Sequence, residues 1–493
     1  MAAQRRVRRD PPLVEVVLEG DDDAVGAPAP SDPSHPTDHA GTGRPAPRRW
    51  WLIAAGVALA LAAAAVALDR REAAEQAELA AVPGILTPLA GPVVERWRTD
   101  VALRPGLVEV AGRLVGVESR ADGSVAVVAL DPGTGRELWR APARAPGAVD
   151  VQTRCALPSP GTALVACVVV DEVAVAEVAG AGRLTYPPRT RVVVVDAATE
   201  EIVHDGPVEP RTSVATLGAD LVLGDVGADG RVRVRRTDAR AGAERWTFTS
   251  PEPLPLNAFR RRDATVTVAG GLVVVDGGSI WVLSAAGDVL RAWAAPAGSP
   301  TRGRVEVLRA GRLLYEQAAA DDGTHAEIVD LATGRAFAVD GSPVVAVPDD
   351  GSLAEVVLVQ SPDGELIAYE LASGRRRWAI SSAGGGGTVI RAGRVVRGEG
   401  DELQSIDGRT GELVWAVPAG QAAFSPLASD GHAVLVTGPA AGRGLVLTAF
   451  GLDDGRRLWA ADVPDGLYAL VGLGGRLYGR GGQLVAFGPS AGG

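Results

Sequence analysis

Aspartates that recur at a fixed distance from glycine and tryptophan are the residues whose type and spacing could do chemistry. The full Asp-Gly-Trp phrase occurs as Asp131, Gly135 and Trp139, as Asp238, Gly242 and Trp246, and as Asp407, Gly411 and Trp415; Gly374 and Trp378 follow Glu370, and Gly455 and Trp459 keep only its second half. Converging carboxylates can hold a cation, but an Asp before a turn also accepts hydrogen bonds from backbone N–H groups two or three residues on. We therefore predict that this set consists of structural repeat anchors.

The two cysteines are candidates for a disulfide, a zinc site or a redox pair. Cys155 and Cys167 flank the sequence Leu-Pro-Ser-Pro-Gly, which is typical of a hairpin turn. A zinc site needs further ligands, and a redox pair is usually closer in sequence. In an oxidising compartment this spacing favours a disulfide, which stabilises the fold by about 3 kcal/mol in the chain-entropy model.

Other reactive residues form no recognisable catalytic set. The five histidines are scattered at positions 35, 39, 204, 325 and 432, and His204 stands where the repeated phrase has Trp. The run Gly384–Gly387 has no Lys-Ser or Lys-Thr after it, so it does not match a phosphate-binding loop. No serine lies in a nucleophile elbow. The sequence therefore predicts no catalytic residue, no metal and no cofactor.

Short apolar strands must position the anchors. A strand pattern precedes each phrase, as in residues 124–130, and an apolar run after Gly lies further upstream, as in residues 271–275. Each unit thus holds about four strands in about forty residues, the length of a propeller blade. A β-sandwich predicts no fixed Asp-Gly-Trp spacing, and the coils of a β-solenoid are shorter. The unit over residues 140–204 is longer and must carry an insertion.

The repeats resemble the PQQ-like family, whose tryptophan-docking blades occur in quinoprotein alcohol dehydrogenases and in the propeller scaffold of the outer-membrane assembly machinery. The resemblance covers residues 93–490. It implies an all-β propeller of four-stranded blades, usually eight. A strict count of units gives nine, but we expect eight, with one irregular unit. Residues 93–97 are expected to pair with the C-terminal unit and close the ring.

The same resemblance would imply, for the dehydrogenases, a quinone at the propeller axis, a Ca²⁺ held by carboxylate and amide groups, a catalytic Asp and often a disulfide between adjacent cysteines. This chain has no adjacent cysteines, and Asn257 is the single asparagine of the propeller region. We therefore expect no quinone cofactor and no enzyme activity.

A membrane segment is predicted before the propeller. Residues 50–68 contain no charge and, as a helix, would span about 28 Å, close to one hydrocarbon core. Arginines precede the segment, so the positive-inside rule predicts a cytoplasmic N-terminus and an exported propeller. A cleaved signal peptide is the main alternative, but the charged region before the segment is too long for one. The expected organisation is a tail (1–48), a transmembrane helix (49–69), a helical stalk and linker (70–92) and the propeller (93–490).

Charge and composition limit the partners. The formal net charge is −11 and every basic residue is Arg, so a nucleic-acid partner is not expected. We expect a non-catalytic scaffold in the cell membrane that binds envelope proteins or cell-wall components. A sensor that signals through the tail, where residues 14–23 combine apolar and acidic residues, is one alternative. A PQQ-dependent dehydrogenase is the other.

Overall fold

The computed structural model describes residues 59, 66, 70, 74, 76–101, 103, 106–146, 153–158, 162–178, 182–256, 262–294, 303–308, 311–318, 324–384, 386–420, 426–440 and 444–490. The chain divides into two compact units, residues 1–69 and residues 70–493. The predicted tail and, apart from Leu59 and Val66, the predicted transmembrane segment lie outside the described residues. Among the residues that are described, no helix combines the length and the apolar character needed to cross a membrane.

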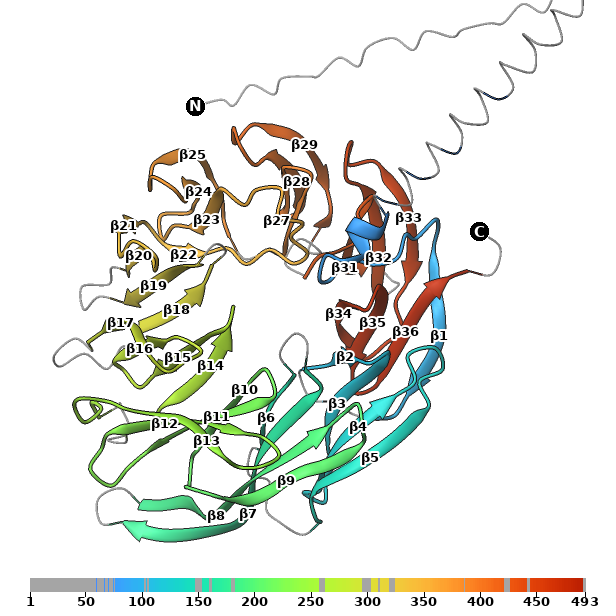
Figure 1. Cartoon of the computed structure of the whole chain (residues 1–493). Helices are drawn as coiled ribbons and strands as arrows, with labels where there is room; N and C mark the ends of the chain where they lie inside the picture. The colour runs from blue at the N-terminus through green and yellow to red at the C-terminus, as the bar shows by residue number, and fades with distance from the viewer. Residues whose placement is uncertain are drawn as a thin grey trace, which may run out of the picture. The chain divides into compact units, whose positions relative to one another are not determined.

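The second unit is an all-β propeller. Its described residues form nine four-stranded antiparallel sheets, or blades, that follow one another around a ring (Figure 1). Blades 1 to 3 contain β2 (Val108–Val110), β3 (Arg113–Ser119), β4 (Val125–Leu130) and β5 (Glu137–Arg144); β6 (Arg154–Ala156), β7 (Leu164–Val178), β8 (Gly182–Asp196) and β9 (Glu201–Val208); and β10 (Ser213–Leu217), β11 (Asp220–Val226), β12 (Val232–Asp238) and β13 (Glu244–Thr249).

Blades 4 to 6 contain β14 (Thr265–Ala269), β15 (Leu272–Asp276), β16 (Ile280–Leu283) and β17 (Val289–Trp293); β18 (Gly303–Val307), β19 (Arg312–Ala318), β20 (Thr324–Asp330) and β21 (Ala336–Val339); and β22 (Ser342–Pro343), β23 (Val356–Gln360), β24 (Glu365–Glu370) and β25 (Arg376–Ser381). Blades 7 to 9 contain β26 (Thr388–Arg391), β27 (Arg394–Glu399), β28 (Glu402–Asp407) and β29 (Leu413–Pro418); β30 (Ala428–Ser429), β31 (Ala433–Ala440), β32 (Gly444–Gly451) and β33 (Arg457–Asp462); and β34 (Leu467–Leu473), β35 (Arg476–Gly481), β36 (Leu484–Pro489) and β1 (Val93–Thr99).

The expectation of eight blades is wrong, and the strict count of nine is right. Every unit, including those with a degenerate phrase, forms a complete four-stranded sheet. The repeated phrase acts only on the contact between one blade and the next. A contact between two neighbouring blades does not fix the number of blades in the ring. The usual blade number of the family therefore did not predict the number in this chain.

The ring is closed by strands from the two ends of the propeller. The N-terminal strand β1 pairs antiparallel with the last strand β36, from Val93 opposite Pro489 to Thr99 opposite Leu484. This is the closure that the sequence predicts. It makes the ninth blade depend on residues almost four hundred positions apart, so the ring cannot form until both ends are present.

Nine apolar clusters form the core of the described residues, and each lies between two neighbouring blades. The alternating strands of one blade present apolar side chains to both neighbours because successive residues point to opposite faces. We call each zone between neighbouring blades a seam. Since every seam has its own core, the ring is stabilised by nine separate contacts.

A segment before the ring packs onto it. Residues 76–80 are helical and include the buried Leu79, and the buried side chains of Ile85 and Leu86 follow. The backbone N–H of Leu86 donates to Ser429 O (2.9 Å), and the N–H of Thr87 donates to Gly475 O (2.7 Å). Residues 79–89 therefore belong to the folded propeller, although the sequence indicated only a stalk and linker there.

Candidate interaction site

The repeated phrase builds the same turn wherever its Asp and Gly are both present. In the turn between β4 and β5, the N–H of Gly135 donates to the carbonyl of Asp131 (2.8 Å), and Gly411 makes the same bond to Asp407 (2.8 Å). The φ of Gly135 is +69°, a backbone conformation that side chains disfavour. The turn therefore favours glycine at this position.

The repeated aspartates are occupied by these turns. Asp131 Oδ1 accepts from the backbone N–H groups of Gly133 (3.0 Å) and Thr134 (2.8 Å). Asp238 Oδ1 accepts in the same way from the backbone N–H groups of Arg240 (3.0 Å) and Ala241 (2.8 Å). The Thr134 hydroxyl and N–H hold the pKa of Asp131 below its ordinary value. Each carboxylate is therefore ionised at neutral pH and bonded within its own turn.

The tryptophans join one blade to the next. A Cβ at Gly411 of blade 7 would lie 2.7 Å from Cγ of Trp378 in blade 6, because the indole ring covers this glycine. The Trp378 Nε1–H donates to the carbonyl of Gly408 (3.0 Å) in the same turn. We call a seam complete when a ring covers the glycine and its N–H bonds to the turn.

Four seams are complete. Their ring–glycine pairs are Trp97 with Gly135, Trp246 with Gly287, Trp378 with Gly411, and Trp415 with Gly455. Their indole N–H groups donate to Pro132 O (3.1 Å), Ala285 O (2.9 Å), Gly408 O (3.0 Å) and Leu452 O (3.0 Å). In the last two seams both partners are predicted anchors, whereas Trp97 and Gly287 were not in the predicted set. Spacing within one phrase could not reveal these pairs, because each joins two neighbouring blades.

Both seams of blade 2 are incomplete. Between blades 1 and 2, Glu200 stands at the glycine position with φ +69°, and the buried Trp139 Nε1 has no hydrogen-bond partner among the described residues. Between blades 2 and 3, His204 replaces the tryptophan, and no atom lies within 4 Å of a Cβ built on Gly242.

The other seams vary. Phe337 covers Gly374 without an N–H to donate. The Trp293 Nε1–H donates to the Glu327 carboxylate (2.7 Å), away from the turn. Trp459 points toward the ninth blade, which lacks the phrase, and its Nε1 has no partner among the described residues.

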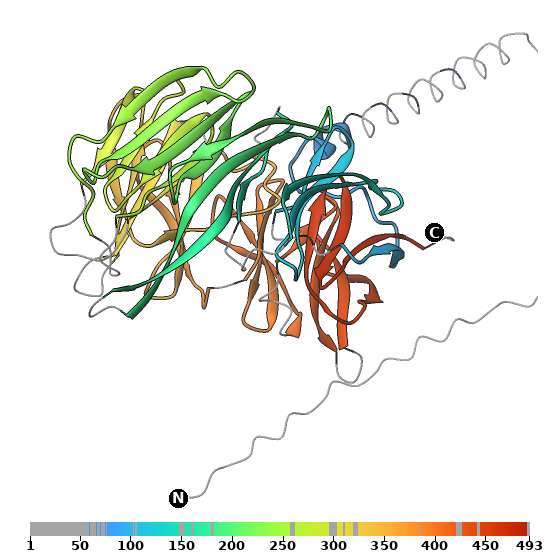
Figure 2. The same cartoon turned by 90° about the horizontal axis from the view of Figure 1, so that it is seen from below.

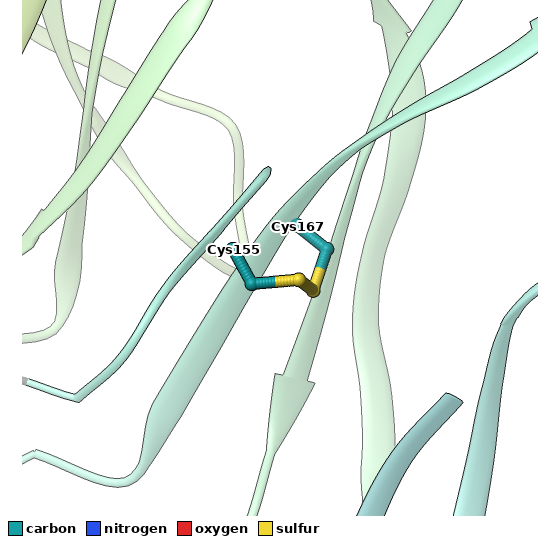
Figure 3. Close-up of a disulfide and its surroundings, with 2 residues drawn as sticks. All are labelled: Cys155 and Cys167. Atoms are coloured by element: carbon teal, nitrogen blue, oxygen red, sulfur yellow. A yellow bond between two sulfur atoms is a disulfide. The ribbon is translucent and has the colours of Figure 1, made fainter. Parts of the chain in front are cut away.

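A disulfide joins Cys155 and Cys167, as the sequence predicts (Figure 3). The two cysteines lie opposite each other on β6 and β7, with 4.0 Å between their Cα atoms. Both side chains contact the core of the seam between blades 1 and 2. The disulfide therefore ties the short inner strand of blade 2 to its neighbour.

The two rims of the ring differ. One rim carries the phrase turns and most of the tight turns after the first strand of each blade, such as residues 111–112 and 392–393; we call it the turn face. The opposite rim, the loop face, carries the described connections between blades, such as residues 209–212, 340–341 and 463–466. Residues 79–89 bind to the turn face, at the turns 430–432 and 474–475. The loop face is therefore the rim that this segment does not cover.

A cavity of about 370 Å³ lies beside the inner strands of blades 7 to 9. It is lined by Gly84, Val345, Val347, Pro348, Gly386, Gly387, Thr388, Pro426, Leu427, Ala428, Leu470, Val471 and Gly472. None of these residues is charged. In the part of the chain that the structure describes, no three His, Cys, Asp or Glu side chains gather in a way that could hold a metal. This cavity therefore presents no carboxylate that could hold a Ca²⁺.

Comparison with known proteins gives one family match. The family model described as "Outer membrane protein assembly factor BamB" matches residues 121–380 and 362–493. No curated protein matches the chain. Among solved structures, BamB from Moraxella catarrhalis is 15% identical, with 81% of this chain and 99% of that chain covered and a TM-score of 0.42. A quinohemoprotein alcohol dehydrogenase from Pseudomonas putida HK5 is also 15% identical, with 82% and 78% covered and a TM-score of 0.40.

Proposed function

Because the chain belongs to the family described as outer membrane protein assembly factor BamB, we propose that it is a non-catalytic interaction scaffold, anchored in the cell membrane by residues 49–69. In this proposal the N-terminus is cytoplasmic and the propeller extracytoplasmic, where it binds envelope proteins or cell-wall components. The disulfide between Cys155 and Cys167 supports an exported propeller, because disulfides persist in oxidising compartments.

The difference between the two faces is the observation that carries the proposal. The turn face is built from tight turns and is partly covered by residues 79–89. The loop face presents the connections between blades, and loops on a rigid scaffold are where binding residues concentrate. The repeated Asp and Trp side chains serve the turns and seams, so the phrase that dominates the sequence contributes stability and leaves recognition to the loop face.

Site-specific photo-crosslinking tests the proposal. A photo-reactive residue replaces Asp122, Asp229 or Asp363, which are exposed in turns on the loop face. Matched controls place it at Arg240, Thr333 or Arg409, which are exposed on the turn face. We expect the loop-face positions to crosslink to the same few envelope proteins in intact cells. Identical crosslinking from both faces would contradict the proposal.

Enzyme activity is tested separately. The full chain is titrated with PQQ and Ca²⁺ while tryptophan fluorescence and dye-linked alcohol oxidation are followed. The proposal predicts neither saturable binding nor turnover. Tight binding with turnover would make the protein a dehydrogenase and overturn the non-catalytic assignment.

A further inference from the structure

Two strands of blade 2 extend beyond the rest of their sheet. β7 and β8 pair from Leu164 opposite Asp196 to Val178 opposite Gly182. In contrast, β6 pairs only with residues 166–168 of β7, and β9 pairs only with residues 190–196 of β8. Residues 171–178 and 182–189 therefore form a two-stranded ribbon, which we call the hairpin arm. No third strand pairs with it among the described residues (Figures 1 and 2).

The base of the arm is held firmly. Arg191 Nε donates to Asp171 Oδ2 (2.9 Å), its Nη1 donates to Asp205 Oδ2 (2.7 Å), and its Nη2 donates to the carbonyl of Ala143 in blade 1 (2.6 Å). One side chain thus connects β7, β8, β9 and the preceding blade. The ribbon leaves the ring from a fixed point, toward the loop face, because the connection between the second and third strands of every blade lies on that rim.

The two edges of the arm differ in their ability to accept another strand. The β8 edge contains Pro187 and Pro188, which have no N–H to donate, and Arg183 and Arg189. Proline and charge are the usual devices that prevent an edge from pairing. Residues 173–178 of β7 read Val-Ala-Val-Ala-Glu-Val, with no proline and no basic residue. The two prolines interrupt the β8 edge, whereas β7 carries no proline and only acidic charges, so its edge can pair with a strand of opposite charge.

The charge of the arm indicates which strand fits this edge. β7 carries Asp171, Glu172 and Glu177 within the arm and no basic residue. The arginines of the arm are on β8. Arg189 Nε lies 3.5 Å from Glu172 Oε2, and the backbone of Arg183 pairs with that of Glu177. A strand added beside β7 meets the acidic strand first. Opposite charges on neighbouring strands are favourable, and like charges are not.

From this geometry we propose that the β7 edge of the hairpin arm binds an extended, basic segment of a partner protein as an added strand. The inference rests on the proposed scaffold role and names the chemistry of one partner. Backbone hydrogen bonds supply the affinity, and Lys or Arg side chains opposite the carboxylates supply the selectivity. A two-stranded ribbon has little stability by itself in water, so a third strand also stabilises the arm.

The test measures binding of synthetic peptides to the full chain in neutral detergent by fluorescence anisotropy. The probe is a seven-residue peptide that alternates Thr and Lys; the controls alternate Thr and Glu, or carry a central Pro in the basic peptide. We expect the basic peptide to bind and both controls to bind at least about tenfold more weakly. A variant in which Asn-Gly replaces residues 173–188 should lose the binding. Equal binding of the acidic and basic peptides would overturn the proposal.

Proline substitutions locate the binding edge. In an antiparallel ladder the N–H groups of a residue pair point either both inward or both outward. Amide hydrogen exchange identifies which pair, Val175 with Thr185 or Ala176 with Leu184, points outward. Proline at the β7 member of that pair (Val175→Pro or Ala176→Pro) should abolish peptide binding, whereas proline at the β8 member (Thr185→Pro or Leu184→Pro) should not.

Two other outcomes separate the possible failures. Peptide binding that survives the β7 proline would overturn the inference. A concentration-dependent dimer that the same proline abolishes would also overturn it, since the edge would then bind a second copy. If loop-face crosslinks to envelope proteins persist while the arm variants change nothing, the scaffold proposal stands and only the arm inference fails.

Discussion

Blades 7 and 2 use the same phrase with different completeness. On both sides of blade 7 an indole ring covers a glycine and donates to the next turn, through Trp378 and Trp415. On both sides of blade 2 the arrangement is broken, by Glu200 at one seam and His204 at the other. Blade 2 nevertheless forms a four-stranded sheet with apolar cores on both faces.

The difference shows that docking is one of several ways to hold a blade. Blade 2 replaces it with the disulfide between β6 and β7 and with the ion pairs of Arg191. The same blade carries the hairpin arm. A blade that is cross-linked within its own sheet, and that does not depend on indole docking at either seam, is suited to carry an element that must reach outside the ring.

The largest expected effect separates the two kinds of seam. Trp378→Ala removes a buried ring and leaves the Gly408 carbonyl without its donor, so we expect a loss of about 3–5 kcal/mol in the free energy of unfolding. His204→Ala, at the equivalent position of blade 2, should cost less than about 1 kcal/mol, because the His204 ring does not cover Gly242 of the next blade. Urea unfolding of both variants measures the difference. Equal losses would mean that docking does not distinguish these blades.

The disulfide should matter most where docking is absent. Replacing both Cys155 and Cys167 with Ala should lower the free energy of unfolding by about 3 kcal/mol, because the unfolded chain is no longer cross-linked. Thermal unfolding with and without a reducing agent checks this. Reduction should destabilise the native chain by a similar amount and leave the variant unchanged; a variant that still responds to the reducing agent would refute the explanation.

Two glycines with the same backbone conformation allow a matched comparison. Gly411 and Gly242 have φ of +79° and +67°, so either Gly→Ala change costs roughly 1–2 kcal/mol from the backbone alone. At Gly411 the new Cβ also lies 2.7 Å from the Trp378 ring, which adds about 1–3 kcal/mol of overlap. Chemical denaturation should therefore place Gly411→Ala below Gly242→Ala in stability. If Gly242→Ala were the less stable variant, close packing of the Trp378 ring could not be the reason for glycine at position 411.

The smallest expected effect is a gain. His204 pairs with Val194 in blade 2 as Trp415 pairs with Ser405 in blade 7, so the two residues occupy equivalent positions. No ring covers Gly242 in the neighbouring blade. His204→Trp should complete the seam and stabilise the protein by about 1 kcal/mol, from the buried ring and its new hydrogen bond. Fluorescence of the added indole, compared between the single variant and one that also carries Gly242→Val, reports whether the ring docks. An indole equally solvent-exposed in both would contradict the prediction.

Much of the fold could be predicted from local signals. The Asp and Gly of each phrase act within a few residues, so their spacing indicated the turns, and the Cys155–Cys167 pairing followed from one hairpin. The blade count was predicted wrongly, because it depends on contacts between units. The packing of Leu79 and Leu86 was missed, since two apolar residues beside prolines give no periodic pattern.

The candidate binding surface was less accessible to sequence reasoning. The insertion in residues 140–204 was evident from length, but only the register of β7 and β8 shows that it is a ribbon with two unequal edges. The division into a turn face and a loop face likewise depends on strand direction in all nine blades.

By itself the sequence determined the repeated unit, its turns, the disulfide and the closing strand, because short-range hydrogen bonds and apolar alternation are encoded within each stretch of chain. The tertiary structure decided the number of blades, which ring meets which glycine, and which strand edges stay open. These features arise where residues from different units meet, and a pattern within one unit carries no information about its neighbour across the seam.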